Sequence, residues 1–304
     1  MILVWGVQRD PPLAAVTAAL VRRGQTVVFV DQHDVLTTEM DLCVDGNVSG
    51  MLRLPIGELD LTRITGVYIR PYETSRLTPV AGAPPALQAR AAALDEALLC
   101  WSEVTPARVV NRPAAMASNH SKPYQSALIQ AQGFDVPETL ITTDRDALEA
   151  FWEEHGEIVY KSISGVRSIV TRVTPSHRQR FNDLANCPTQ FQRWIPGSDV
   201  RVHVSGDDVF ACEIKSSATD YRYPREEEEE APEIQTVELP LDVDDRCRRV
   251  VASMSLLLAG IDLRRTPDGH WFCLEVNPSP GFTYYESATG QPIADSIASV
   301  LAGR

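Results

Sequence analysis

Apolar residues in the first hundred positions form short β-prone runs separated by a longer amphipathic stretch. This order is typical of a strand, a helix and a second strand. The elements expected here are strand Ile2–Val7, helix Asp10–Arg23, strand Thr26–Val30, strand Gly66–Ile69 and helix Pro84–Glu103. A strand–helix–strand order predicts a parallel sheet. The glycine fingerprint G-x-G-x-x-G of dinucleotide-binding sheets is missing.

The pattern changes from about residue 111 onward. The stretch NHSKPYQSALIQAQG predicts a helix that stops at Gly133, and EIVYKSISGVRSIVTRV predicts a strand, a turn and a strand. Two hairpins are expected, one turning at Ser205–Asp208 and one at Pro267–Gly269. A helix over about Val243–Ala259 is expected between them.

Composition indicates an ordinary globular chain, and charge narrows its partners. Of 304 residues, 44 % are hydrophobic and 23 % are charged, and the formal charge is −13. That charge argues against passive electrostatic binding to nucleic acid or to an anionic membrane surface. No apolar run reaches the roughly 18 residues that a membrane helix needs. The six cysteines form no C-x-x-C pair, which favours reduced thiols and a cytoplasmic location.

The stretch CLEVNPSPGF places an acid and an amide at the end of an expected strand. Glu275 and Asn277 are two residues apart and therefore share one face. The second hairpin would bring Asp262 from the neighbouring strand close to Glu275 or Asn277. Two carboxylates and an amide oxygen suit Mg²⁺. The alternative is that Asp262 and Glu275 are edge-strand polar residues paired with arginines, and spacing leaves both interpretations open.

Two groups of cationic residues are candidates for anion binding. Lys122 precedes a helix, and Lys161 ends an apolar strand directly before SISG, where backbone amides and an ammonium can face phosphate. The P-loop spacing is absent, so a solvated lysine is the alternative. Arg201, with Lys215 and Arg222 further along the chain, could bind carboxylate or phosphate. A surface cross-strand pair is the alternative for Arg201.

The order of these motifs resembles that of an ATP-grasp ligase of the RimK-like type, a group that includes the graspetide-type peptide maturases. The resemblance rests on the two lysines, the Q-x-W-I strand, DVR, DYR and GIDL…LEVNP, and it covers about residues 108–304. It implies an α/β protein with the ATP-grasp fold, α+β in its catalytic part. A parallel α/β domain over residues 1–107 would be followed by subdomains over 108–195 and 196–304, the last with the magnesium site.

The same resemblance implies a role for each candidate residue. The residues expected to bind ATP are Lys122 and Lys161 at the α- and β-phosphates, Ser164 and Gly165 in a closing loop, Gln192, Trp194 and Ile195 at the adenine, and Asp199 at the ribose. Those expected at the γ-phosphate and acyl phosphate are Arg201, Lys215 and Arg222, and those expected to bind two Mg²⁺, with Mn²⁺ as a substitute, are Asp262, Glu275 and Asn277.

Two positions depart from the patterns of the family. Arg193 stands where the adenine hinge usually has a glutamate. NPSPGF stands where many maturases have N-P-x-G-Q.

The activity implied by the resemblance is the joining of a carboxylate to an amine. The carboxylate attacks the γ-phosphorus of ATP to give an acyl phosphate and ADP, and the amine then displaces phosphate. Substrates would be amino acids, peptides or small metabolites, with neither nucleic acid nor membrane as a partner and with a homo-oligomer as in many relatives.

Two alternatives differ in what the chain acts on. The tail PSPGFTYYESATGQPIADSIASVL resembles that of graspetide-type maturases, which link Asp or Glu side chains of a precursor peptide to Lys, Ser or Thr. The run Glu226–Glu230 would attract a basic leader or form a solvated loop. A nucleotide-binding module without turnover is the other alternative, and the complete set of candidate residues argues against it.

Overall fold

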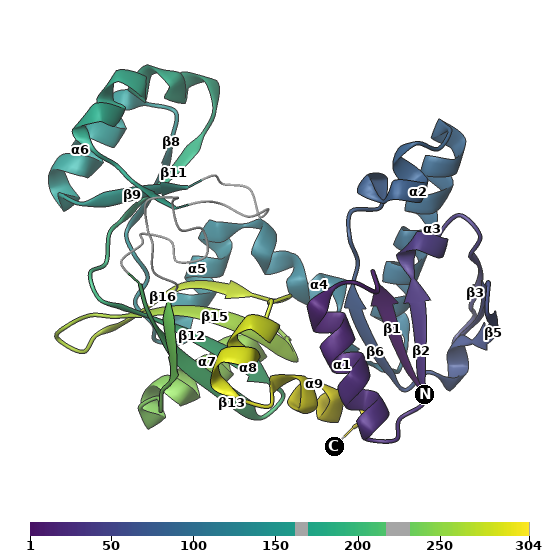
Figure 1. Cartoon of the computed structure of the whole chain (residues 1–304). Helices are drawn as coiled ribbons and strands as arrows, with labels where there is room; N and C mark the ends of the chain where they lie inside the picture. Colours follow the sequence, from purple (N-terminus) through teal and green to yellow (C-terminus); the bar gives the residue numbers. More distant parts are fainter. Residues whose placement is uncertain (162–169, 217–231, 304) are drawn as a thin grey trace.

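The computed structural model describes residues 1–161, 170–216 and 232–303. Figure 1 shows three parts: an N-terminal sheet with its helices, a small central sheet, and a larger C-terminal sheet that lies between the other two. The predicted site residues Ser164, Gly165 and Arg222 and the run Glu226–Glu230 lie outside the described residues.

The N-terminal part contains the parallel sheet that the sequence predicts. Its strands stand in the order β2-β1-β6-β7, and every neighbouring pair is parallel. These strands and the helices that connect them are β1 (Ile2–Gly6), α1 (Pro11–Arg22), β2 (Val27–Asp31), β6 (Gly66–Arg70), α2 (Thr78–Ala81), α3 (Pro85–Val104) and β7 (Arg108–Val110). Helix α1 begins at Asp10, whose carboxylate accepts a hydrogen bond from the Leu13 amide.

A second, antiparallel sheet lies between β2 and β6 along the chain, and it was not predicted from the sequence. Its strands are β3 (Glu39–Val44), β4 (Val48–Leu54) and β5 (Gly57–Asp60). Five of the six residues of β3 are exposed, although its sequence, EMDLCV, has the polar–apolar alternation that marks a half-buried strand. Short 3₁₀ turns at 32–34, 61–63 and 74–76 complete this part.

The central part is a four-stranded antiparallel sheet in the order β10-β9-β11-β8. Its elements, with the helices that lead into it, are α4 (Pro113–Met116), the 3₁₀ turn Ala117–His120, α5 (Lys122–Ala131), β8 (Thr139–Thr142), α6 (Arg145–His155), β9 (Ile158–Lys161), β10 (Thr171–Arg172), the 3₁₀ segment η5 (Pro175–Asn186) and β11 (Thr189–Arg193). Leu148 of α6 and Phe181 of η5 pack against Phe191 on one face of the sheet.

The C-terminal part is a five-stranded antiparallel sheet in the order β14-β13-β12-β15-β16. Its elements are β12 (Ser198–Ser205), β13 (Asp208–Lys215), β14 (Glu233–Thr236), α7 (Leu241–Ser253), β15 (Leu258–Arg265), β16 (Trp271–Asn277), α8 (Thr283–Thr289) and α9 (Ile293–Leu301). Both predicted hairpins are present.

The helix predicted over Val243–Ala259 ends earlier in the structure than the sequence indicated. Helix α7 ends at Ser253, Ser255 adopts a left-handed φ of 57°, and β15 starts at Leu258. The apolar run MSLLLAG is compatible with a helix or a buried strand, because periodicity does not separate the two over so short a stretch.

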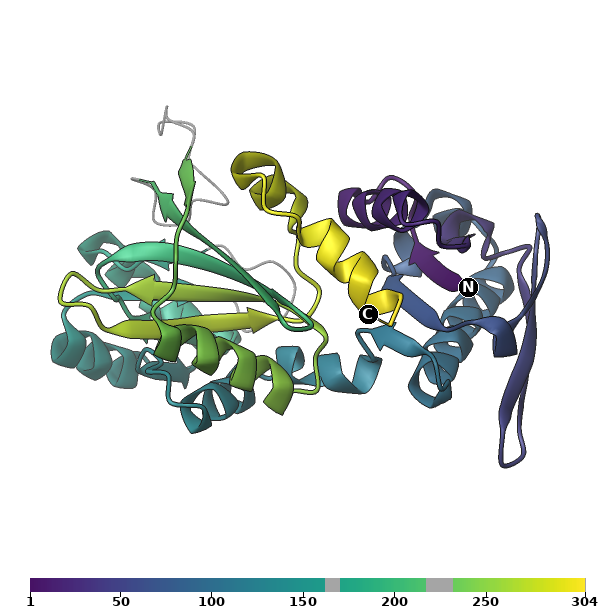
Figure 2. The same cartoon turned by 90° about the horizontal axis from the view of Figure 1, so that it is seen from below.

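The last helix of the chain packs on the first sheet. Figure 2 shows α9 lying between the C-terminal sheet and the N-terminal part. Ile297 of α9 is fully buried in one apolar cluster with Ile2 of β1 and Leu13 of α1. Gly66 allows this approach, since a Cβ at that position would come within 2.5 Å of the Leu301 carbonyl oxygen. Among the described residues, no helix has the length and apolar character needed to cross a lipid bilayer.

We expect Ile297→Ala to lower the free energy of unfolding by about 2–5 kcal/mol, because it leaves a cavity between α9 and the N-terminal sheet. Urea unfolding followed by tryptophan fluorescence measures the change. Ile56→Ala is the matched control, since Ile56 is 79 % exposed, and it should have little effect. Equal effects of the two substitutions would contradict the packing role of α9.

Candidate active site

Two adjacent antiparallel strands of the C-terminal sheet each carry an acid followed two residues later by an arginine. Asp199 and Arg201 stand two residues apart on β12, and Asp262 and Arg264 stand two residues apart on β15. The antiparallel register sets Asp199 opposite Arg264 and Arg201 opposite Asp262. Each opposed pair is joined at 2.6 Å. Because residues two apart share a face, these four side chains, which we call the charge ladder, lie on one side of the sheet.

Strand β16 and helix α5 extend the charge ladder with a third ion pair. Glu275 stands opposite Asp262 in the register of β15 and β16, as the sequence predicts. Lys122, the first residue of α5, places its Nζ atom 2.5 Å from Glu275 Oε1. Its side chain is only 10 % exposed and that of Glu275 is 26 % exposed. Both carboxylates of the proposed magnesium site therefore have a cation beside them.

Gly260 leaves room for the Arg201 guanidinium of the Arg201–Asp262 pair. Gly260 is paired with Asn277, and a Cβ there would lie 2.0 Å from the Arg201 guanidinium. Arg201 Nε also donates to His203 Nε2 at 3.4 Å. Burial, and next the neighbouring Arg201 charge, hold the pKa of His203 well below its usual range, while a hydrogen bond with the Gly281 backbone opposes that shift. By accepting the hydrogen bond from Arg201 Nε, His203 supports Arg201 from the same strand face.

The candidate magnesium ligands meet the requirements of a hard cation. Two facing carboxylates and the Asn277 amide oxygen at the end of β16 are the donors that Mg²⁺ prefers. In the part of the chain that the structure describes, no group of three or more His, Cys, Asp and Glu side chains converges as a metal cluster, so this candidate site consists of two carboxylates and one amide. Gln125 fixes the strand by bonding the Val276 carbonyl at 2.8 Å and the Val276 amide at 3.1 Å.

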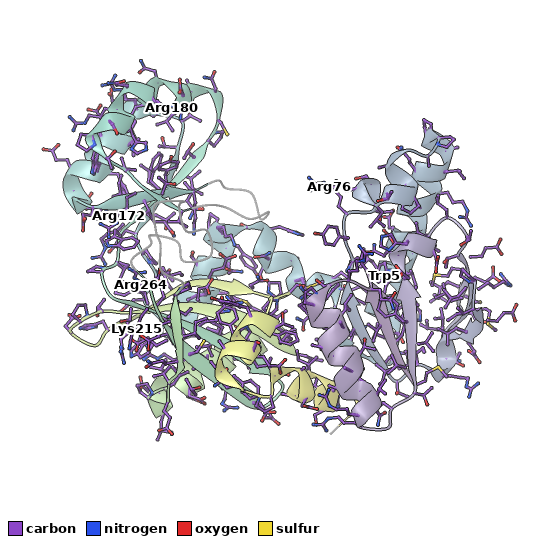
Figure 3. The ribbon with its side chains drawn as sticks, in the orientation of Figure 1. Trp5, Arg76, Arg172, Arg180, Lys215 and Arg264 are labelled. Atoms are coloured by element: carbon purple, nitrogen blue, oxygen red, sulfur yellow. The ribbon has the colours of Figure 1, made fainter. Side chains whose placement is uncertain are left out.

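The predicted adenine hinge lies where the central and C-terminal sheets meet. The Trp194 ring is held between two guanidinium groups, with Arg172 4.0 Å and Arg264 4.3 Å from the ring centroid. Figure 3 shows both labelled arginines at this junction. Arg264 Nε also donates to the Ile195 carbonyl at 2.8 Å. Arg264 therefore joins the hinge to the charge ladder through Asp199.

The backbone edge of the hinge has open hydrogen-bonding groups. The Trp194 amide donates to the Glu157 carbonyl at 2.9 Å. Neither the Trp194 carbonyl nor the Ile195 amide has a hydrogen-bond partner among the described residues. Gln192 is buried, and its amide donates to Thr139 at 2.9 Å.

Arg193, which replaces the usual glutamate of the hinge, is ion-paired with a glutamate from the preceding segment. Its Nε atom lies 2.5 Å from Glu138 Oε2, and its amide donates to the Glu138 carbonyl at 3.0 Å. A carboxylate is thus present beside the hinge, although it comes from outside the Q-x-W-I motif.

Two predicted lysines lie away from the charge ladder. Lys161 ends β9 on the central sheet, where its side chain is buried. Lys215 ends β13 with about half of its side chain exposed, and its Nζ lies 3.6 Å from Glu233. Strand alternation places Lys215 with Glu213 on the face opposite to Arg201. The structure therefore does not bring Lys215 to the same face as the ladder.

Three residues of the site were not singled out from the sequence as functional. Arg264 forms the charge ladder and the hinge contact, Arg172 covers the Trp194 ring, and Gln125 fixes β16. Arg264 carried a usable signal, because it stands two residues after Asp262 on a predicted strand and must share its face. The other two depend on tertiary contacts that no local pattern marks.

A separate pocket of about 250 Å³ lies on the central part. Its lining includes Tyr160, Phe181, Phe191, His177 and Arg180. Since Tyr160 and Lys161 are consecutive on β9, they face opposite sides of the sheet. The pocket therefore opens on the side away from Lys161.

Comparison with known proteins identifies a family. A model of the RimK-like ATP-grasp domain matches residues 118–301. A probable alpha-L-glutamate ligase of Shewanella loihica is 27 % identical over 62 % of this chain, and the match spans 65 % of that protein, just under two thirds of its length. A probable alpha-L-glutamate ligase of Alkalilimnicola ehrlichii is 26 % identical over 76 % of this chain and 79 % of its own.

Solved structures resemble the chain over its whole length. The macrocyclase MdnC of Microcystis aeruginosa, bound with precursor peptide MdnA, covers 100 % of this chain and 99 % of its own with a TM-score of 0.84 at 20 % identity. The ATP-grasp ligase PsnB, complexed with a minimal precursor variant, Mg and ADP, covers 99 % and 97 % with a TM-score of 0.80 at 26 % identity. These likenesses confirm the expected fold.

We expect Asp199→Ala to destabilise the protein by about 2–3 kcal/mol, because it leaves the largely buried Arg264 guanidinium without its anion. Adding Arg264→Met should restore part of that loss. The midpoint and slope of urea unfolding measure both effects. Asp41→Ala, which breaks the exposed Asp41–Arg53 pair, is the control and should change little. Additive losses in the double variant would argue against a coupled pair.

Proposed function

The chain belongs to the RimK-like ATP-grasp family, and we propose that it activates a carboxylate with ATP and joins it to an amine, with release of ADP and phosphate. The observation that carries the proposal is the arrangement of Asp262 and Glu275. They face each other across two strands, and each has a cation, Arg201 or Lys122, at hydrogen-bond distance. Carboxylates for metal and cations for phosphate thus stand on one rigid surface.

The proposed reaction brings two anions together, and the residues of the site serve that task. A substrate carboxylate must approach the γ-phosphate, so positioning and neutralisation of charge account for most of the catalysis. Arg201 and Lys122 are the cations nearest to the carboxylate pair, and we assign them to phosphate oxygens. When bound by Asp262, Glu275 and Asn277, Mg²⁺ supplies the neutralisation of the β- and γ-phosphates. Two ions, with Mn²⁺ as a substitute, are part of the proposal.

We assign the nucleotide to the junction of the central and C-terminal sheets. The Trp194 carbonyl and the Ile195 amide would pair with the adenine edge, and Asp199 with the ribose. Lys161 would reach the phosphates from the central sheet. Ser164, Gly165 and Arg222, which lie outside the described residues, keep their proposed roles from the sequence. Lys215 is not assigned to the phosphates, because it lies on the opposite face of the sheet from Arg201. The subdomain limits at 107 and 195 are proposed on the same basis.

For the substrate, two candidates differ in size. The curated relatives are named as glutamate ligases and match 62 % and 76 % of this chain, which supports an amino acid as one substrate. The peptide-bound structures overlap 99–100 % of it, including the N-terminal part, which supports a peptide maturase. The pocket at Phe181 and Phe191 lies away from the ladder and would hold one large apolar side chain of such a peptide. We therefore favour a peptide substrate.

We expect Glu275→Gln and Lys161→Met each to reduce substrate-stimulated ADP release by about 100-fold or more, because each removes a charge that acts on the phosphates or their metal. A coupled ADP assay measures the rate, and circular dichroism confirms the fold of both variants. Glu153→Gln, at an exposed position of α6, should leave the rate unchanged. Wild-type ADP release in both site variants would refute the ligase assignment.

We expect a screen for phosphate release to give its strongest response with peptides that carry Asp or Glu side chains and a nearby nucleophile. Free amino acids and dipeptides form the comparison set. Mass spectrometry of the product should show the loss of one water per bond formed. Phosphate release with free amino acids alone would identify an amino-acid ligase instead of a maturase. If a peptide loses water and an added nucleophile does not change the rate, the bond formed is an intramolecular crosslink.

A further inference from the structure

The segment that follows the proposed magnesium ligand Asn277 is held by polar side chains from distant parts of the chain. Asn111, just after β7, donates from its side chain to the Pro278 carbonyl at 2.6 Å and to the Leu258 carbonyl at 2.7 Å. His203 of β12 bonds the backbone at Gly281. Pro278 and Gly281 are therefore contacted by side chains from two distant parts of the chain.

Between these two points the loop is held by an arginine of the N-terminal sheet. Arg70, the last residue of β6, donates from Nη1 to Ser279 Oγ at 3.0 Å and to the Pro280 carbonyl at 2.9 Å. Its Nε donates to Asp10 Oδ2 at 2.9 Å. The side chains of Arg70 and Asp10 are 14 % and 18 % exposed, so the contact is largely shielded from water.

The orientation of Arg70 is itself well determined. Asp10 caps helix α1 through the Leu13 amide and accepts from Arg70 with the same oxygen. Strand β6 lies in the interior of the parallel sheet, between β1 and β7. Asp10 is thus fixed by its role as a helix cap, and Arg70 by its position on an interior strand. Neither position depends on the loop after Asn277.

The held loop turns back on the metal ligand. The Ser279 amide donates to Asn277 Oδ1 at 2.9 Å. A carbonyl oxygen has two lone pairs, so this bond leaves one available for a cation. The contacts form a continuous chain from Asp10 to Arg70, Ser279 and Asn277, which begins in the N-terminal part and ends at the proposed metal site.

We propose that Arg70, oriented by Asp10, is a positioning residue for Asn277, so that the N-terminal part completes the geometry of the magnesium site. The proposal rests on the proposed function, because that function assigns Asn277 to the metal. Residues that orient metal ligands by hydrogen bonds typically contribute 10–100-fold to metal affinity. An arginine at this position thus does more than join two parts of the molecule.

A second contact between the N-terminal and C-terminal parts supplies the matched control. Arg108 of β7 donates from Nη1 to the Val300 carbonyl of α9 at 2.9 Å. Like Arg70, it links the parallel sheet to the C-terminal part through one guanidinium, but it does not contact the loop after Asn277. A purely adhesive role predicts equal effects of Arg70→Met and Arg108→Met.

The test measures binding of Mn²⁺ to the full chain in the presence of ADP, by electron paramagnetic resonance, so that the readout does not depend on turnover. We expect Arg70→Met and Asn277→Ala each to weaken Mn²⁺ binding by about 10-fold or more, and Arg108→Met to leave it unchanged. The double variant Arg70→Met/Asn277→Ala should bind no more weakly than Asn277→Ala, because Arg70 acts through Asn277.

The outcomes separate this proposal from the function on which it rests. Weakened binding in Asn277→Ala with wild-type binding in Arg70→Met would overturn the positioning role and leave the metal site intact. Unchanged binding in both Asn277→Ala and Glu275→Gln would instead refute the metal assignment. Should Arg70→Met fail to fold, Ser279→Ala decides the matter, since it removes one of the two loop acceptors of Arg70. Unchanged Mn²⁺ affinity in that variant would also overturn the proposal.

Discussion

The cross-strand pairing of opposite charges between β12 and β15 is the constraint on which the candidate site depends. An acid and an arginine alternate on each strand, and the antiparallel register turns two like sequences into two neutral pairs. A register slip of one residue would move the two charged side chains of the slipped strand to the opposite face of the sheet. A slip of two would set like charges against each other. The charges therefore specify the register as well as the chemistry.

The same charge ladder joins parts of the chain with different tasks. At one end of the ladder, Asp262 faces Glu275, which pairs with Lys122, and these residues are proposed to bind metal and phosphate. At the other end, Arg264 contacts Trp194 and Ile195, which are proposed to bind the base. In the proposed function, base and metal would thus both be bound beside one strand, β15. The distance between the proposed base site and the proposed metal site is therefore set by the backbone of β15. Motion of side chains alone does not change that distance.

The sequence predicted the site where strand alternation decides it, and failed where tertiary contacts decide it. The hairpin of β15 and β16 and the pairing of Asp262 with Glu275 follow from a turn signal and a period of two, and both are confirmed. Asp262 also has the arginine partner that the alternative interpretation expected, since Arg201 lies beside it. Arg70 and Arg172 could not be found, because their partners lie 209 and 22 positions away and no local pattern links them. The sheet of β3 to β5 was missed although a local signal was present, since the β3 sequence EMDLCV alternates polar and apolar residues.

The packing of α9 on the first sheet has a consequence for how the protein is made. Strands β1 and β6 and helix α1 are complete within the first 70 residues, yet part of their apolar surface packs against residues 293–301. On the ribosome, domains generally fold as units from the N-terminus onward. Here the first unit keeps part of its apolar face exposed until residues 293–301 have been synthesised. Until then, the first 70 residues offer an apolar surface that a chaperone can shield.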